Sequence, residues 1–114
     1  MNDPFLNWCS THLEACEARR KALLADQRGD EARFEQVRSN VYGIFRTAYG
    51  ALGHSRAHLL QRLSEISAPW EESLRQAEIH GDTDKAHIER VKLNACAEVR
   101  RFAEAMEEAA HDGK

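Results

Sequence analysis

Four side chains that could hold a metal ion are spaced so that three of them share one face of a helix. Cys9, His12 and Cys16 follow one another at intervals of three and four residues, which is helical spacing. Cys96 would lie level with Cys16 if the first and last helices were antiparallel neighbours. Three cysteines and one histidine form an accepted structural zinc set. A metal-binding or metal-sensing bundle, with zinc as its cofactor, is therefore one hypothesis for the function.

The competing interpretation of the cysteines is structural. Cys9 and Cys16 fall on the apolar stripe of the first helical segment, and a buried free cysteine packs as a small hydrophobic side chain. Zinc ligands also commonly lie in turns with short Cys spacing, which this chain lacks. The sequence therefore favours core cysteines over a metal site.

A second group of residues indicates a contact surface. Small side chains recur at spacings of four, four and three residues, at Ser39, Gly43, Thr47 and Gly50. Two of them are glycine, which inside a helix costs about 1 kcal/mol relative to alanine. Small residues allow the backbone of a second helix to approach closely. Tyrosine and arginine, which often anchor interfaces, flank them. The predicted interface comprises Ser39, Tyr42, Gly43, Arg46, Thr47, Tyr49 and Gly50.

No catalytic motif is present, so we expect a protein that is not an enzyme. The main hypothesis is a small protein–protein interaction module, such as an adaptor, small chaperone or regulatory subunit, whose partner is another protein or a second copy in a homodimer. A net charge of −3 argues against nucleic acid as partner. The sequence has no apolar run suited to a membrane and an odd number of cysteines, which predicts a cytoplasmic location.

The elements that must position these residues are four helical segments. Only 6 of the 114 residues are glycine and 2 are proline, and apolar residues recur at helical spacing throughout. Short connections favour antiparallel neighbours. The sequence predicts an all-α fold, an antiparallel up-down four-helix bundle, as a single domain over residues 1–114.

The second segment has the most regular apolar stripe. Gly29 is expected to end the helix before it, and Asp30 to cap its start. The residues expected on the core face of this helix are Phe34, Val37, Val41, Ile44, Ala48 and Ala51. Phe45 and Leu52 extend that face to one side.

Pro69 interrupts the third segment, although the apolar stripe continues in phase across it. Proline in a helix removes a hydrogen bond and clashes with the preceding turn. We expect a helix kinked near Pro69, or a break with a new start at Ser67, within one long element.

The two halves of the chain also resemble each other. Ala25, Gly29 and Asp30 match Ala77, Gly81 and Asp82, and after a two-residue insertion the match resumes. Ala32, Glu35, Val37 and Asn40 then fall on Ala86, Glu89, Val91 and Asn94. Two interpretations remain open: duplication of a helical hairpin, with an approximate twofold axis, or convergence of hairpins on similar turn and core residues.

Overall fold

The chain forms four helices in the computed structural model, which describes the backbone of residues 3–112 and the side chains of residues 3–106. They are α1 (Pro4–Ala25), α2 (Gly29–Ala51), α3 (Arg56–Ile79) and α4 (Thr83–Asp112). No strand occurs in the described part of the chain. The all-α prediction is therefore confirmed, as is the bundle of antiparallel hairpins.

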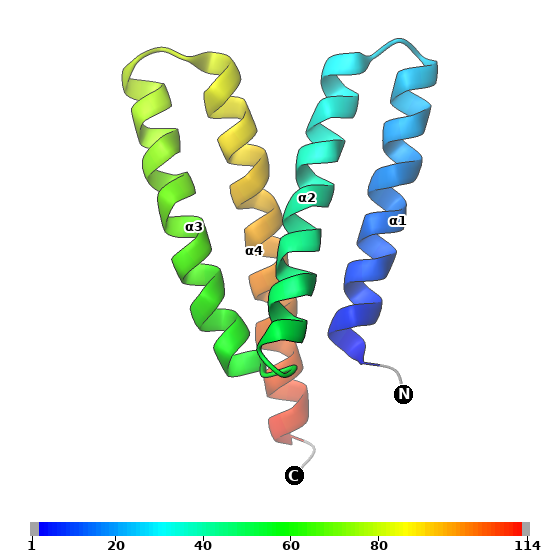
Figure 1. Ribbon diagram of the computed structural model, residues 1–114, viewed down its shortest axis with the longest axis vertical. Coiled ribbons are helices and arrows are strands. Elements are labelled where there is room, and N and C mark those ends of the chain that lie inside the picture. The colour runs from blue at the N-terminus through cyan, green and yellow to red at the C-terminus, as the bar shows by residue number, and fades with distance from the viewer. Residues whose placement is uncertain (1–2, 113–114) are drawn as a thin grey trace.

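The helices are arranged as two hairpins that meet through their second members (Figure 1). The most extensive contacts join α1 to α2 and α3 to α4, and the next most extensive join α2 to α4. Both α2 and α4 start at the end that carries the hairpin turns, so this central pair is parallel. The helices α1 and α3 lie on the outside and make few contacts across the bundle.

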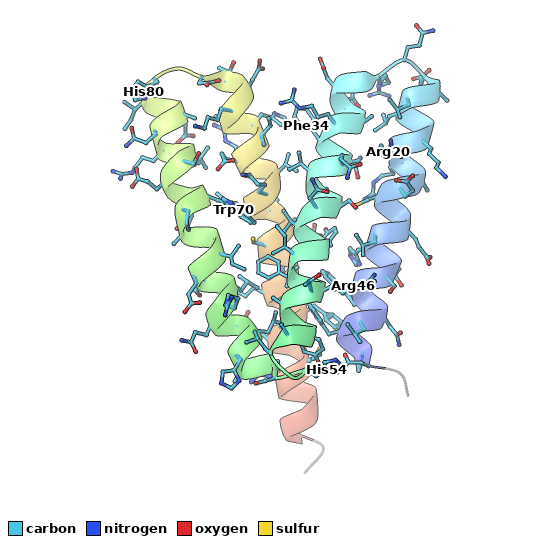
Figure 2. The ribbon with its side chains drawn as sticks, viewed as in Figure 1. Arg20, Phe34, Arg46, His54, Trp70 and His80 are labelled. Atoms are coloured by element: carbon cyan, nitrogen blue, oxygen red, sulfur yellow. The ribbon has the colours of Figure 1, made fainter. Side chains whose placement is uncertain are left out.

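The two hairpins diverge toward their turns and converge at the opposite end, where the α2–α3 connection lies (Figure 1). The radius of gyration is 15.6 Å, against about 13 Å for a compact domain of this length. Near the turns, Phe34 of α2 points toward α4 and stacks on His87, with ring centroids 4.1 Å apart (Figure 2). The bundle is thus an open one, with its two halves bridged near the turns by an aromatic contact.

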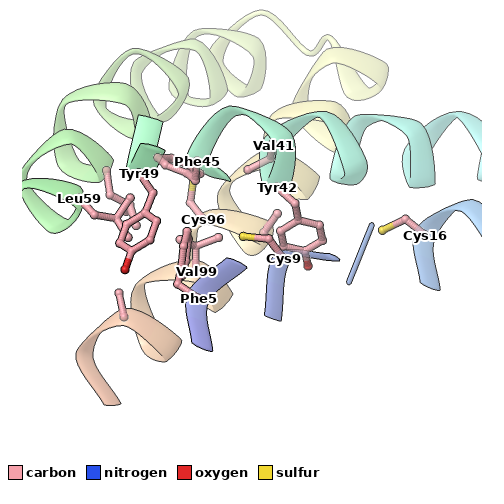
Figure 3. Close-up of a cluster of buried hydrophobic side chains, with 13 residues drawn as sticks. Phe5, Cys9, Cys16, Val41, Tyr42, Phe45, Tyr49, Leu59, Cys96 and Val99 are labelled. Atoms are coloured by element: carbon pink, nitrogen blue, oxygen red, sulfur yellow. The ribbon is translucent and has the colours of Figure 1, made fainter. Parts of the chain in front are cut away.

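The core occupies the convergent end, where side chains from all four helices meet (Figure 3). Its aromatic centre is formed by Phe5, Tyr42, Phe45 and Tyr49, each at most 3% exposed. Its full set of buried members is Phe5, Cys9, Cys16, Val41, Tyr42, Phe45, Tyr49, Leu59, Leu63, Ala95, Cys96, Val99 and Ala103.

The buried face of α2 differs from the predicted stripe. Ile44, expected in the core, is 40% exposed, whereas Tyr42 and Tyr49, expected at the surface, are 1% and 3% exposed. The reason is the position of α2, which packs against both α1 and α4 and touches α3 little. Its covered face is centred on Val41 and Phe45, and Ile44 lies at the edge of that face.

The first hairpin turn also differs from the prediction. The helix α1 ends at Ala25 and α2 starts at Gly29, preceded by Arg28, which makes no side-chain cap. The left-handed position that commonly holds glycine at a helix end is occupied by Gln27, with φ of 60°. Gly29 therefore neither ends α1 nor precedes a cap at Asp30, which lies inside the first turn of α2.

This geometry changes how the two halves align. The amide of Arg28 donates to the carbonyl of Leu23 over 2.8 Å, and the amide of Asp82 donates to Ala77 over the same distance. The left-handed residue is Gln27 in one turn and Gly81 in the other. Equivalent positions are thus separated by fifty-four residues without the predicted insertion, and Gly29 does not correspond to Gly81.

The same separation relates the buried residues of the two central helices. Each buried residue of α2 has a buried counterpart in α4, the pairs being Ala32 with Ala86, Val41 with Ala95, Tyr42 with Cys96, Phe45 with Val99 and Tyr49 with Ala103. This is the pattern expected of two hairpins related by a twofold axis. Duplication of a hairpin stays a prediction, because convergent packing would produce similar burial.

Pro69 does not divide the third helix, which is continuous from Arg56 to Ile79. The alternative of a break with a new start at Ser67 is therefore wrong. Pro69 itself is exposed. Ser67 is buried, and its hydroxyl donates to the carbonyl of Ser64 over 3.3 Å. The bend expected at Pro69 stays a prediction.

Candidate functional site

The predicted metal ligands do not come together. Cys9, Cys16 and Cys96 are free and buried, and Cys16 lies further along α1, away from Cys96 (Figure 3). His12 turns its ring against Trp8, with centroids 4.0 Å apart, and its Nδ1 lies 3.0 Å from the Trp8 carbonyl oxygen. No three His, Cys, Asp or Glu side chains among the described residues could hold a metal ion together.

The packing order of the helices explains why these side chains lie apart. The helix α1 packs mainly on α2 and touches α4 little, so Cys96 does not come level with Cys16 across a shared seam. Burial raises the pKa of the Cys9 and Cys96 thiols to about 12, which keeps both protonated and poorly nucleophilic at neutral pH. All three cysteines therefore serve as small core side chains.

The predicted interface on α2 separates into an exposed part and a buried part. Arg46, Thr47 and Gly50 are exposed, and Ser39 and Gly43 are half-buried. The two tyrosines are in the core and cannot act as surface anchors. The prediction placed them at the rim because it centred the core stripe on Ile44. An alternative apolar series, Tyr42, Phe45 and Tyr49, has equally good helical spacing and would have indicated their burial.

Each buried tyrosine instead ties two helices together through its hydroxyl group. Tyr49 donates to Oδ2 of Asp3 over 2.8 Å, and its ring stacks on His54 with centroids 4.9 Å apart. Burial, followed by the hydrogen bond to Asp3, raises the pKa of Tyr49 to about 12. Tyr42 donates to Oε2 of Glu98 on α4. Both tyrosines are therefore structural hydrogen-bond donors at neutral pH.

A surface that sequence reasoning missed lies between α1 and α4. A groove of about 440 Å³ opens there, lined by Trp8, His12, Glu98, Arg101 and Phe102. We call it the aromatic groove. The rings of Trp8 and Phe102 stack with centroids 5.2 Å apart and 22° between their planes. Only the approach of α1 to α4 at the convergent end brings these two rings to one groove.

A second groove follows the seam between α3 and α4. Its volume is about 410 Å³, with an apolar floor that includes Leu63, Leu93 and Cys96 and charged side chains such as Glu71 and Arg100 around it. The guanidinium of Arg100 donates to the hydroxyl of Ser64 over 2.8 Å. Arg101 borders both grooves.

These features define an all-α bundle of two helical hairpins with surface grooves and buried thiols. Comparisons of the chain with family models, with curated proteins and with solved structures gave no match. Of the helices in the described part of the chain, none combines the length and apolar character needed to cross a membrane.

Proposed function

We propose that this chain is a non-enzymatic helical interaction module that forms a homodimer through the outer face of α2. The observation that carries the proposal is the surroundings of Gly43 and Gly50. A Cβ atom added to either glycine would meet no neighbouring atom within 4 Å in the described part of the chain. Packing within the chain therefore does not require glycine at these positions.

The cost of these glycines supports an external reason for them. Each costs about 1 kcal/mol relative to alanine inside a helix. Together with Ser39 and Thr47 they leave a shallow strip onto which the backbone of a second helix can pack closely. Arg46 is exposed beside this strip and offers the planar donor group that interfaces favour.

The remaining parts of the proposal rest on the sequence. The chain contains no recognised catalytic motif, which supports a non-enzymatic role as an adaptor, small chaperone or regulatory subunit. Three free cysteines are compatible with a reducing compartment, and we propose a cytoplasmic location on that ground.

The test is the mass of the protein in solution at roughly tens of micromolar, where interfaces of micromolar affinity are populated. The natural chain is expected to be a dimer, and Gly43→Leu is expected to be a monomer because the leucine side chain would hold the second helix away. Gly43→Ala should stay dimeric and gain about 1 kcal/mol of stability.

A matched control is Ala97→Leu, which adds the same side chain at the corresponding position of α4, fifty-four residues later. It should leave the mass unchanged. A natural chain that is strictly monomeric and unaffected by Gly43→Leu would remove the homodimer from the proposal.

A further inference from the structure

We propose that the aromatic groove between α1 and α4 binds an acidic peptide segment that carries an aromatic side chain. The inference deepens the proposed function as an interaction module, because it names a second surface and the chemistry of its partner. It does not depend on dimerisation, since the groove and the strip on α2 share no residue.

The floor of the groove suits a planar apolar group. Trp8, His12 and Phe102 are half-buried, and their rings already pack on one another, Trp8 against both of the others. Offset and tilted ring pairs add roughly 0.5–1.5 kcal/mol beyond the burial of their surface. A further aromatic side chain can extend this cluster without rearrangement of the helices.

The charges around the groove favour an anionic partner. Both carboxylate oxygens of Glu98 are engaged: Oε2 accepts from Tyr42, and Oε1 lies 3.7 Å from the guanidinium of Arg38. Arg101 is exposed, and no group in the described part of the chain pairs with it. An unpaired guanidinium can donate two parallel hydrogen bonds to the oxygens of a carboxylate.

Packing of the two hairpins does not by itself require aromatic side chains at these positions. The corresponding positions, fifty-four residues away between α2 and α3, carry Arg62, Ile66, Ile44, Thr47 and Ala48. None of these side chains is aromatic, although they border the same kind of helix junction. The aromatic rings are therefore confined to one of the two junctions, as expected of a site added to the fold.

A single-stranded nucleic acid could also stack on aromatic rings beside an arginine. Such partners need a positively charged track along their backbone. Among the described residues that line the groove, Arg101 is the one arginine or lysine, and it can pair with a single carboxylate but cannot follow successive phosphates. A single cation therefore favours a short segment with a carboxylate beside its aromatic side chain over a nucleic acid.

The probe is the blocked peptide Glu-Asp-Phe-Glu-Asp, titrated into the full-length isotope-labelled chain while the two tryptophan indole N–H signals are followed by NMR. The chain has one tryptophan in the groove, Trp8, and one outside it, Trp70. The Trp8 signal should shift and saturate, while the Trp70 signal should stay in place. Replacing phenylalanine by alanine in the peptide, or its acids by lysines, should abolish the shift.

Two variants distinguish the contributions of the neighbouring residues Arg100 and Arg101 to peptide binding. Arg101→Ala should weaken peptide binding at least fivefold, whereas Arg100→Ala, whose guanidinium bonds to Ser64, should change it less than twofold. Equal losses from both variants, or a Trp70 signal that moves with Trp8, would overturn the site. Binding of an oligothymidylate to Trp8 in preference to the peptide would overturn the partner class.

Measuring the mass of the same samples distinguishes the two proposals. A monomer whose Trp8 signal responds to the peptide removes the homodimer and keeps the groove. A dimer whose Trp8 signal is indifferent to every peptide keeps the homodimer and removes the groove.

Discussion

Asp3 joins the start of α1 to the end of α2 through one carboxylate. Its Oδ1 accepts from the amides of Phe5 and Leu6 and so caps α1, while its Oδ2 accepts from the hydroxyl of Tyr49. Burial by itself would raise the pKa of Asp3. The hydrogen bonds from Tyr49, Leu6 and Phe5, and the nearby His54, outweigh it and hold the pKa below 3.8.

This lowered pKa makes stability depend on pH in a defined direction. Ionised Asp3 stabilises the folded chain above pH 3.8, and the contribution is lost as the pH falls through the lower folded value. Asp3→Asn keeps a capping side chain and removes the charge. We expect it to lower the free energy of unfolding by about 1 kcal/mol at neutral pH and to change it less in acid. Urea denaturation across this pH range measures both.

A control for this variant is Glu14→Gln, which removes an exposed carboxylate from the same helix. Its effect on the free energy of unfolding should be small. The free energies of unfolding of Asp3→Asn and the natural chain should differ less in acid than at neutral pH. An equally large difference at both pH values would contradict the role assigned to the ionised carboxylate.

At the scale of the element, α3 tolerates a proline that most helices exclude. Pro69 has no N–H to donate to the carbonyl of Glu65, and its ring crowds the preceding turn. The helix nevertheless continues because the residues before and after the proline keep one apolar face on the bundle. Leu59 and Leu63 are buried before it, and Ala77 is buried after it.

We therefore expect Pro69→Ala to stabilise the protein by about 1–3 kcal/mol, because it restores a helical hydrogen bond and relieves the clash. The midpoint of urea unfolding measures the gain. Pro4→Ala is the matched control, since Pro4 lies in the first turn of α1, where a missing N–H costs nothing. Equal midpoints for Pro69→Ala and the natural chain would mean that contacts of the proline ring offset its cost.

At the scale of the whole molecule, burial is uneven along the bundle. The core cluster is concentrated at the convergent end, while the divergent end has smaller buried side chains such as Ala32, Ala77 and Ala86. The carboxylate of Glu89 is also buried there, paired with Lys92 over 2.5 Å. A region that buries little apolar surface opens more readily.

Hydrogen exchange should follow this gradient. We expect amides of residues 33–36 in α2 and 87–90 in α4 to exchange faster than those of residues 41–49 and 95–103, because the first two segments lie outside the main core. Exchange measured by mass spectrometry or NMR on the natural chain tests this. Uniform protection along α2 and α4 would show that the hairpins open only together with the core.

The sequence by itself determined the four helices and their hairpin pairing. Helical periodicity and short turns act locally, so no distant contact was needed to predict them. The turn residue Gln27 escaped this reasoning because a left-handed glutamine leaves no signal comparable to glycine. Only the tertiary structure decided that α2 and α4 form the centre of the bundle, because a helical stripe shows which face is apolar and does not show which helix covers it. That arrangement buries Tyr42, exposes Ile44, keeps Cys16 away from Cys96, and places Trp8 beside Arg101 in one groove.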